Sequence, residues 1–201
     1  MQATATKIHQ TSSLQRINEY CDDVLEGRIV AGPHVRNACR RHFDDLDKGH
    51  ERGLWFDEDA CDYVFRFFET QLYLSEGQFA GRQLKLEPSQ AFILGSIFGW
   101  KREDGRRRFK RAYVEQGKGN GKSPIAGGIG LFCLPADKEN GAQIYSAAAK
   151  KDQAQILFRD AVQMVRESPS LTKRIEISGG QGREDNLAFH PASSFMRPVS
   201  R

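Results

Sequence analysis

The sequence predicts an α/β fold in which a helical subdomain precedes a parallel sheet flanked by helices. Three observations support it: apolar residues repeat at helical spacing in the first third of the chain, later segments alternate between strand-like and helix-like patterns, and a glycine-rich turn joins a strand to a helix. Alternating strands and helices favour parallel sheets with crossover helices. We therefore divide the chain into a helical subdomain, residues 1–76, and an α/β part, residues 77–201.

The composition is that of a folded chain. Hydrophobic residues make up 39% of the 201 residues, charged residues make up 28%, and 13 Phe can fill a core, which argues against disorder. The longest apolar stretches are shorter than the ~20 residues that a membrane helix needs. Met1–Gln10 lacks the apolar core of a signal peptide, and the four cysteines form no CxxC pair, so a reducing cytoplasm is expected.

Three helices are predicted in the first subdomain. The first helix ends near Gly27 and carries apolar residues at helical spacing, namely Leu14, Ile17, Cys21, Val24 and Leu25. The second begins near Pro33, because proline is tolerated in a first turn. The third begins at the acidic turn Asp57–Asp59, which suits a helix N-terminus, and runs to Leu72. The polar segment Asp47–Leu54 is predicted as a linker.

Two small groups in this subdomain have the residue types of metal sites. Cys39 and His42 form a C-x-x-H, but no second pair completes a zinc site and both lie on the apolar helix face, so core packing is expected. Asp44, Asp45 and Asp47 resemble part of a calcium loop, but the D-x-[DN]-x-[DN]-G order is broken. We expect these acids to lie in a solvated turn.

The pattern changes after Gly77. Leu84–Leu86 is extended, and Pro88 opens a short helix from Gln90 to Phe98. Two predicted strands, Arg108–Val114 and Ala142–Ala148, then precede the helices Ser123–Leu134 and Asp152–Arg166. Shorter strand-like pieces follow at Arg174–Ser178, Asn186–His190 and Ser194–Val199.

Positive charge is concentrated in one segment. The formal net charge is +4, but seven basic residues lie between Lys101 and Arg111 against two acids, Glu103 and Asp104. Such a cluster contacts a polyanion or forms a solvated hairpin, and both alternatives stay open. The interleaved aromatic residues of a platform that binds single strands are lacking.

The glycine-rich turn is the most informative segment, with the sequence Gly117-Lys118-Gly119-Asn120-Gly121-Lys122-Ser123. Glycines let backbone amides surround an anion at a helix N-terminus, a lysine such as Lys122 reaches the β- and γ-phosphates, and a hydroxyl such as that of Ser123 binds Mg²⁺. Two residues depart from G-x-x-x-x-G-K-[ST]: Gln116 replaces the first glycine, and Pro124 lacks an amide. The alternative is a glycine-rich turn without a ligand.

Several segments in order resemble the large terminase subunit of tailed bacteriophages, over most of residues 27–201. They are Val30-Ala31-Gly32 before the Val35–Phe43 helix, Leu86-Glu87-Pro88-Ser89-Gln90, Ile97-Phe98-Gly99-Trp100, the glycine-rich turn and Ala147–Ala154. Loops of this family are also variants, commonly with a basic residue where this chain has Lys118.

The resemblance implies a P-loop NTPase-type parallel sheet, with ATP and Mg²⁺ as cofactors. By this resemblance Lys122 and Ser123 are catalytic, Ser123 is the metal ligand, and 117–123 with Gln90 bind the nucleotide. Gln90 is similar to the adenine-contacting glutamine of helicase-like ATPases, although it can also be an ordinary residue of a first helical turn. Ala148–Gln153 looks like the element that joins the ATP site to DNA, whereas Lys150 and Lys151 can be solvated lysines.

The resemblance also implies a motor that couples ATP hydrolysis to the translocation of double-stranded DNA into the procapsid. Its partners would be phage DNA, the portal protein, the small terminase subunit and further copies of the chain. It would work in the cytoplasm of the infected host at the procapsid portal, without membrane contact. Two alternatives are a non-catalytic interaction module of the packaging complex and another nucleic-acid-dependent P-loop ATPase.

One element of such a motor is missing from the sequence. A second carboxylate pair, Asp-Glu at the end of an apolar strand, should hold Mg²⁺ and activate water. Glu184–Asp185 follows Gln181-Gly182-Arg183 and does not have this pattern. We therefore expect an incomplete sheet without that pair and without a nuclease domain, in a fragment or split gene product that binds nucleotide but hydrolyses it poorly.

Overall fold

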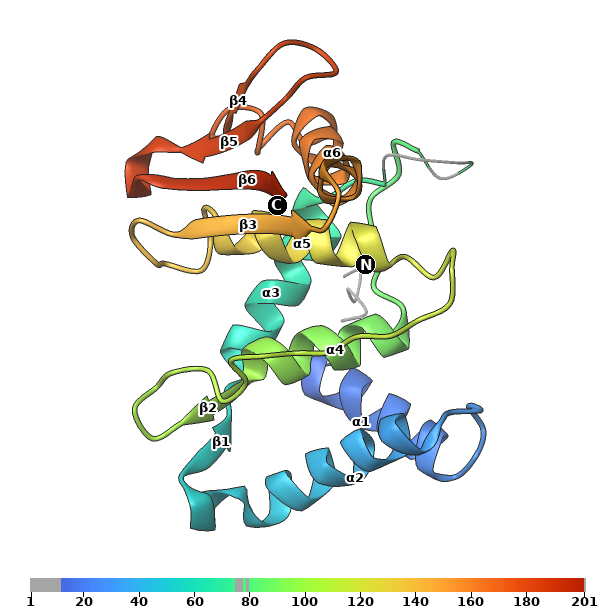
Figure 1. Cartoon of the computed structure of the whole chain (residues 1–201). Coiled ribbons are helices and arrows are strands. Elements are labelled where there is room, and N and C mark those ends of the chain that lie inside the picture. Colours follow the sequence, from blue (N-terminus) through green and yellow to red (C-terminus); the bar gives the residue numbers. More distant parts are fainter. Residues whose placement is uncertain (1–11, 75–77, 79, 201) are drawn as a thin grey trace, which may run out of the picture. The chain divides into compact units, whose positions relative to one another are not determined.

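The computed structural model describes residues 12–74, 78 and 80–200 (Figure 1). Two predictions refer to residues outside these ranges: Met1–Gln10 and the change of pattern after Gly77. The chain divides into a first unit, Met1–Phe65 with Leu86–Ala112, and a second unit, Arg66–Lys85 with Tyr113–Arg201. The sequence-based division at residues 76 and 77 stays a prediction.

Helices dominate the first unit, and the predicted ones are confirmed. They are α1 (Ser13–Leu25), α2 (Pro33–Lys48), the first part of α3 (Glu58–Gln71) and α4 (Pro88–Gly99). The Ser12 hydroxyl caps α1 by accepting the amide of Gln15 at 3.1 Å. Helices α1 and α4 pack closely, because a Cβ at Gly95 would lie 2.2 Å from Ile17 Cδ1.

The predicted linker Asp47–Leu54 is wrong, because most of it is regular structure. Helix α2 continues to Lys48, the 3-10 helix η1 spans Gly49–Arg52, and strand β1 (Leu54–Phe56) begins directly after Gly53. Strand β1 pairs antiparallel with β2 (Trp100–Arg102). This partner is distant in sequence, so the polar composition of the segment does not reveal the pairing.

Cys39 and His42 are core residues, as predicted. The His42 ring is 2% exposed; its Nε2–H donates to Asn18 Oδ1 at 3.0 Å, and its Nδ1 accepts from Trp100 Nε1 at 3.2 Å. Burial lowers the pKa of His42 to about 4. In the described part of the chain, no three potential metal ligands from His, Cys, Asp or Glu come together. The imidazole is therefore a neutral structural group.

Asp45 contradicts the expected solvated turn. All three acids lie in α2; Asp44 and Asp47 are exposed, but Asp45 is buried and its carboxylate pairs with Arg52 and Arg108. The Arg108 guanidinium also lies over the rings of Trp100 and Phe109, at 5.6 and 4.8 Å from their centroids. A buried carboxylate needs such partners.

The sheet of the second unit is mixed, which corrects the predicted parallel sheet. Its strand order is β3-β6-β5-β4, with bounds Gln143–Ala148 (β3), Ser194–Ser200 (β6), Asn186–Phe189 (β5) and Glu176–Ser178 (β4). Strands β3 and β6 are parallel, whereas β5 is antiparallel to both of its neighbours. The short links between β4, β5 and β6 suit hairpins, because parallel neighbours need long crossovers.

Helices α5 (Lys122–Cys133) and α6 (Lys151–Glu167) also belong to the second unit, together with the end of α3. Helix α6 packs on β3, β6 and α5. Glycines allow close contacts around α5: a Cβ at Gly127 would lie 3.5 Å from the Ala161 amide, and one at Gly130 would lie 2.9 Å from the Met196 side chain. In the described part of the chain, no helix has the length and apolarity to cross a bilayer.

The predicted strand Arg108–Val114 is not formed. Residues 109–117 have no regular structure, and the side chains of Tyr113 and Val114 are 88% and 43% exposed. A β-prone segment becomes a strand only when another strand satisfies its backbone groups. No described strand pairs with residues 109–117.

Candidate functional site

The glycine-rich loop directly precedes helix α5. Gly119 has φ of 86°, and Gly121, the N-cap residue, has φ of 71° and ψ of 23°. Glycine adopts this left-handed conformation without the steric cost that a Cβ imposes. A Cβ at Gly119 would meet nothing within 4 Å. The glycines are therefore needed for backbone conformation, which turns the loop into the first turn of the helix.

The first turn of α5 offers amide donors at the end of the loop. The first helical hydrogen bond shown at this end runs from the Ile125 amide to the Gly121 carbonyl at 3.2 Å. The amides of Lys122 and Ser123 therefore have no acceptor within the helix. Pro124 contributes none, as its sequence position predicts. Free amides and the helix dipole together favour an anion at this position.

Lys122 is folded back over the start of the loop. Its Nζ donates to the Gln116 carbonyl at 2.6 Å and to the Gly117 carbonyl at 2.7 Å. Gln116, where the usual pattern has glycine, thus holds the Lys122 ammonium through its backbone carbonyl. The ammonium group is exposed, so a phosphate group could reach it from solvent and replace the two carbonyl oxygens.

The other predicted loop residues differ in their exposure. Lys118 and Asn120 are exposed, and Ser123 is half-buried. Magnesium usually keeps several waters and takes one or two protein oxygens beside those of a phosphate. The Ser123 hydroxyl fits one such position. The loop residues therefore suit a phosphate group with its magnesium ion.

Gln90 has a structural contact in the first unit. Its Oε1 accepts the Glu87 amide at 3.1 Å, while the Glu87 side chain accepts the Gln90 amide. This reciprocal arrangement is a capping box, which satisfies two amides at the start of α4. The role of Gln90 in adenine binding stays a prediction.

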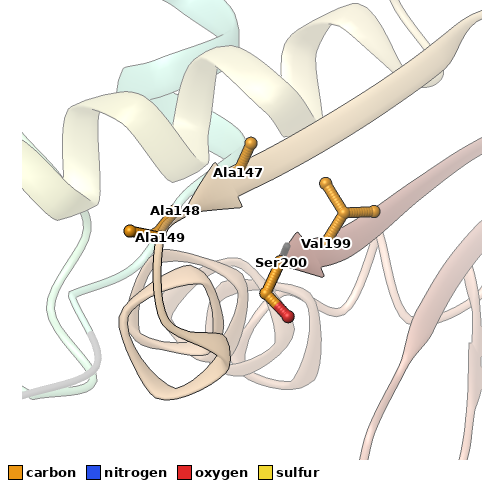
Figure 2. A pocket seen from close by; sticks show the side chains of 5 residues that line it. All are labelled: Ala147, Ala148, Ala149, Val199 and Ser200. Carbon is orange, nitrogen blue, oxygen red and sulfur yellow. The ribbon is translucent and has the colours of Figure 1, made fainter.

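A hollow of about 490 Å³ lies where the parallel strands β3 and β6 end. Ala147, Ala148 and Ala149 line it from the β3 side, and Val199 and Ser200 from the β6 side (Figure 2). In the second unit, the N-terminus of α5 lies at the same end of the sheet as the carboxyl ends of β3 and β6 (Figure 1). Parallel sheets usually bind ligands at the carboxyl ends of their strands.

The sequence identifies only part of this hollow. Ala148–Gln153 is expected to join the ATP site to DNA; its first residues line the hollow, and exposed Lys150 is the N-cap residue of α6. Val199 and Ser200 are missed, because only the parallel pairing of β6 with β3 brings them there.

Glu184 is a buried structural acid. Its carboxylate accepts the Gly182 amide at 3.0 Å and the Arg166 guanidinium at 2.5 Å, directly before β5. Its pKa lies below the ordinary value, because its own backbone amide, the Gly182 amide and Arg166 stabilise the charged form. As expected, it does not lie at the carboxyl end of a strand.

Comparisons with known proteins bear on the family and the fold of this chain. A family model described as terminase large subunit, ATPase domain, matches residues 88–201. The chain is 30% identical over 117 residues to the "Terminase, large subunit" of Enterobacteria phage HK97, which covers 57% of this chain and 22% of that protein. The crystal structure of the HK97 bacteriophage large terminase matches with a TM-score of 0.56 and 24% identity, over 70% of this chain and 27% of that chain. The structural likeness supports the fold, and the chain spans less than a third of the length of either relative.

Proposed function

We propose, from the premise that this chain belongs to the family of terminase large subunit ATPase domains, that it forms the nucleotide-binding part of a DNA-packaging motor. The motor would couple ATP hydrolysis to the movement of double-stranded DNA into a procapsid. The observation that carries this proposal is the glycine-rich loop, with Lys122 at the N-terminus of α5. Site and family membership together favour a nucleotide over another anion.

Each loop residue has a proposed part in binding. The backbone amides of 117–121 and those of Lys122 and Ser123 would surround the phosphates, while the Lys122 ammonium would exchange its two carbonyl partners for the β- and γ-phosphates. The Ser123 hydroxyl would hold Mg²⁺. Bound ATP and Mg²⁺ supply the phosphoanhydride bond and the positive charge that stabilises its cleavage.

Further parts of the proposal concern residues outside the loop. Gln90 would bind adenine through an amide that now caps α4. The Ala148–Gln153 segment would transmit the state of the nucleotide toward DNA. As in the family, the portal protein, the small terminase subunit and further copies of the chain would be partners, at the portal in the host cytoplasm. Residues 1–76 and 77–201 would be the two domains of this chain.

Nucleotide binding is tested with Lys122→Ala and a fluorescent ATP analogue in the presence of Mg²⁺. Hydrogen bonds to charged groups contribute about 1.5–3 kcal/mol, so affinity should fall roughly tenfold to a hundredfold. Lys173→Ala removes an exposed lysine of the same unit and should leave affinity unchanged. Equal affinity in wild type and Lys122→Ala would contradict the assignment of the loop.

Hydrolysis by the 201-residue chain alone should be weak. Neither β3 nor β6 ends in a carboxylate, and none of the described residues that line the hollow beside them is acidic. A motor needs such a group to orient the attacking water. Phosphate release should therefore stay near background, and turnover that depends on Lys122 would show that the acid is supplied from elsewhere in the chain.

A further inference from the structure

The basic segment of the first unit forms a hairpin whose shape is fixed by backbone atoms. The Arg102 amide donates to the Arg106 carbonyl at 3.0 Å, and the Arg108 amide donates to the Trp100 carbonyl at 2.9 Å. Lys101 faces Trp55 of β1 on one side and Arg107 of the returning chain on the other. The hairpin turn is visible beside β2 in Figure 1.

The two faces of this ribbon differ in their side chains. Phe56, Trp100 and Arg108 share the covered face: the two rings lie 5.4 Å apart, and Arg108 reaches the buried Asp45. Because side chains alternate along a strand, Trp55 and Lys101 share the opposite face. Arg102 and Arg106 are not on that face but flank the hairpin turn, where both are exposed. Trp55 is 47% exposed there, which is unusual for the largest apolar ring.

The cations of the ribbon are not neutralised by the protein. Arg102 and Arg106 are exposed, Lys101 is half-buried, and none of the three has an acidic partner among the described residues. Asp104 instead accepts the backbone amide of Arg106. The segment Lys101–Arg111 carries seven basic and two acidic residues, whereas the net charge of the whole chain is only +4. The positive charge of the protein is therefore concentrated on this hairpin and its continuation.

We propose that this ribbon, defined as Trp55, Lys101, Arg102 and Arg106, binds the sugar–phosphate backbone of duplex DNA. Guanidinium groups match the geometry of phosphate oxygens, and the fixed hairpin holds them without further ordering of the backbone. The indole Nε1 of Trp55 donates to the Arg102 carbonyl at 3.2 Å, so the ring offers its apolar surface and no free donor to a base edge. Contact with phosphates and sugars reads no sequence.

A duplex fits the ribbon better than a single strand. Proteins that bind single strands stack successive bases on several aromatic rings, and Trp55 is the one exposed ring of this ribbon. The choice of DNA as the polyanion rests on the proposed function in DNA packaging, whereas the basic surface itself does not. The surface itself lies wholly within the first unit and shares no residue with the glycine-rich loop.

The triple variant Lys101→Gln, Arg102→Gln and Arg106→Gln tests the charge of the ribbon. It keeps every backbone hydrogen bond of the hairpin. A matched control removes three exposed cations of the second unit by Arg159→Gln, Lys173→Gln and Arg183→Gln. Binding to a fluorescent 30-base-pair duplex should be followed by anisotropy at several salt concentrations. Each phosphate that a variant no longer neutralises should lower the salt slope by about 0.9, so the ribbon variant should have a slope smaller by nearly 3 and bind more weakly at low salt.

The control variant should keep most of the wild-type slope. Equal slopes in the ribbon and control variants would overturn the proposal. So would tighter binding to an unpaired strand of the same length, or to polyglutamate of the same charge, since these results would point to a single-strand platform or an acidic protein partner.

Trp55 gives a local readout of the same interaction. The chain has two tryptophans, and Trp100 is 2% exposed, so acrylamide should quench mainly Trp55. Saturating duplex should protect this fluorescence at least severalfold, and the protected component should be missing in Trp55→Phe. Duplex binding without protection of Trp55 would place the DNA on another surface and contradict the proposal.

Nucleotide affinity separates this proposal from the proposed function. The ribbon variant should bind fluorescent ATP as wild type does. If Lys122→Ala leaves ATP affinity unchanged while the ribbon variant has the smaller salt slope, the nucleotide assignment fails and the ribbon stands. If Lys122→Ala weakens ATP binding while the ribbon variant keeps the wild-type salt slope, the nucleotide assignment of the loop is supported and the ribbon proposal is wrong.

Discussion

The core of the first unit and the glycine-rich loop of the second differ in the burial and bonding of their polar groups. In the core, His42 and Asp45 are buried, and each is bonded to partners within the protein. In the loop, the side chains of Lys118, Asn120 and Lys122 are exposed, and Lys122 is held by two carbonyls of the loop itself. Changes in the core should therefore affect folding, whereas changes in the loop should affect ligand binding.

Asp45→Asn should have the largest effect on stability. It leaves the guanidinium of Arg108, whose side chain is 15% exposed, without its counter-ion, and breaking a buried pair costs about 3–5 kcal/mol. Arg52 is 54% exposed and should contribute little. Urea unfolding measures the decrease. Asp44→Asn, one residue away and exposed, should change stability by less than about 0.5 kcal/mol; equal effects in both variants would refute the buried pair.

Acid should destabilise the first unit through His42. Its pKa is about 4 in the folded protein against an ordinary value of 6.5, so the unfolded chain binds more protons between these values. The contribution of neutral His42 to the free energy of unfolding is therefore fully present above about pH 6.5. It is lost as the pH falls toward 4, which lowers the free energy of unfolding by about 3 kcal/mol. Unfolding free energies at a series of pH values check this. His42→Gln should lack this part of the slope, and an unchanged slope would show that His42 is not its source.

Gly95→Ala should have an intermediate effect, also confined to folding. The added Cβ would lie 2.2 Å from Ile17 Cδ1, and overpacking costs about 1–3 kcal/mol. Thermal unfolding of the double variant with Ile17→Val should recover part of the stability. Gly180→Ala, where a Cβ meets nothing within 4 Å, is the control. A destabilisation that Ile17→Val does not relieve would contradict the close packing of α1 on α4.

Gly119→Ala should have the smallest effect on stability and a clear effect on ligand binding. The left-handed conformation at φ of 86° costs a residue with a Cβ about 1 kcal/mol, and the exposed loop can relax. The relaxed loop should bind ATP more weakly. Gly180→Ala changes an exposed glycine whose added Cβ meets nothing within 4 Å, and it should alter neither property. Wild-type ATP affinity in Gly119→Ala would mean that the loop conformation is unimportant for binding.

The same contrast explains how much could be predicted from the sequence. Helices α1 and α2 and the glycine-rich loop depend on local spacing, so they could be predicted. The burial of Asp45 depends on Arg108, 63 residues away, and no local pattern encodes it. The pairing of β1 with β2 escapes prediction for the same reason.

In the second unit, sequence patterns locate the strands well but not their directions. The strands β4, β5 and β6 are expected as separate pieces, and their antiparallel pairing follows from short connections rather than from composition. The strand expected at Arg108–Val114 has β-prone residues but no described partner.

Gln90, in the first unit, shows a further limit of prediction from sequence, because one sequence position suits both a capping box and an adenine contact.

Amide hydrogen exchange of residues 117–123, with and without ATP and Mg²⁺, tests the role of the loop most directly. In the free protein the Lys122 and Ser123 amides have no acceptor within the helix, so exchange should be fast. We expect ATP and Mg²⁺ to slow exchange across 117–123 in the wild-type chain, and Lys122→Ala to need a roughly tenfold to hundredfold higher ATP concentration for the same protection. Unchanged exchange in the wild-type loop at saturating ATP would show that this loop is not the nucleotide site.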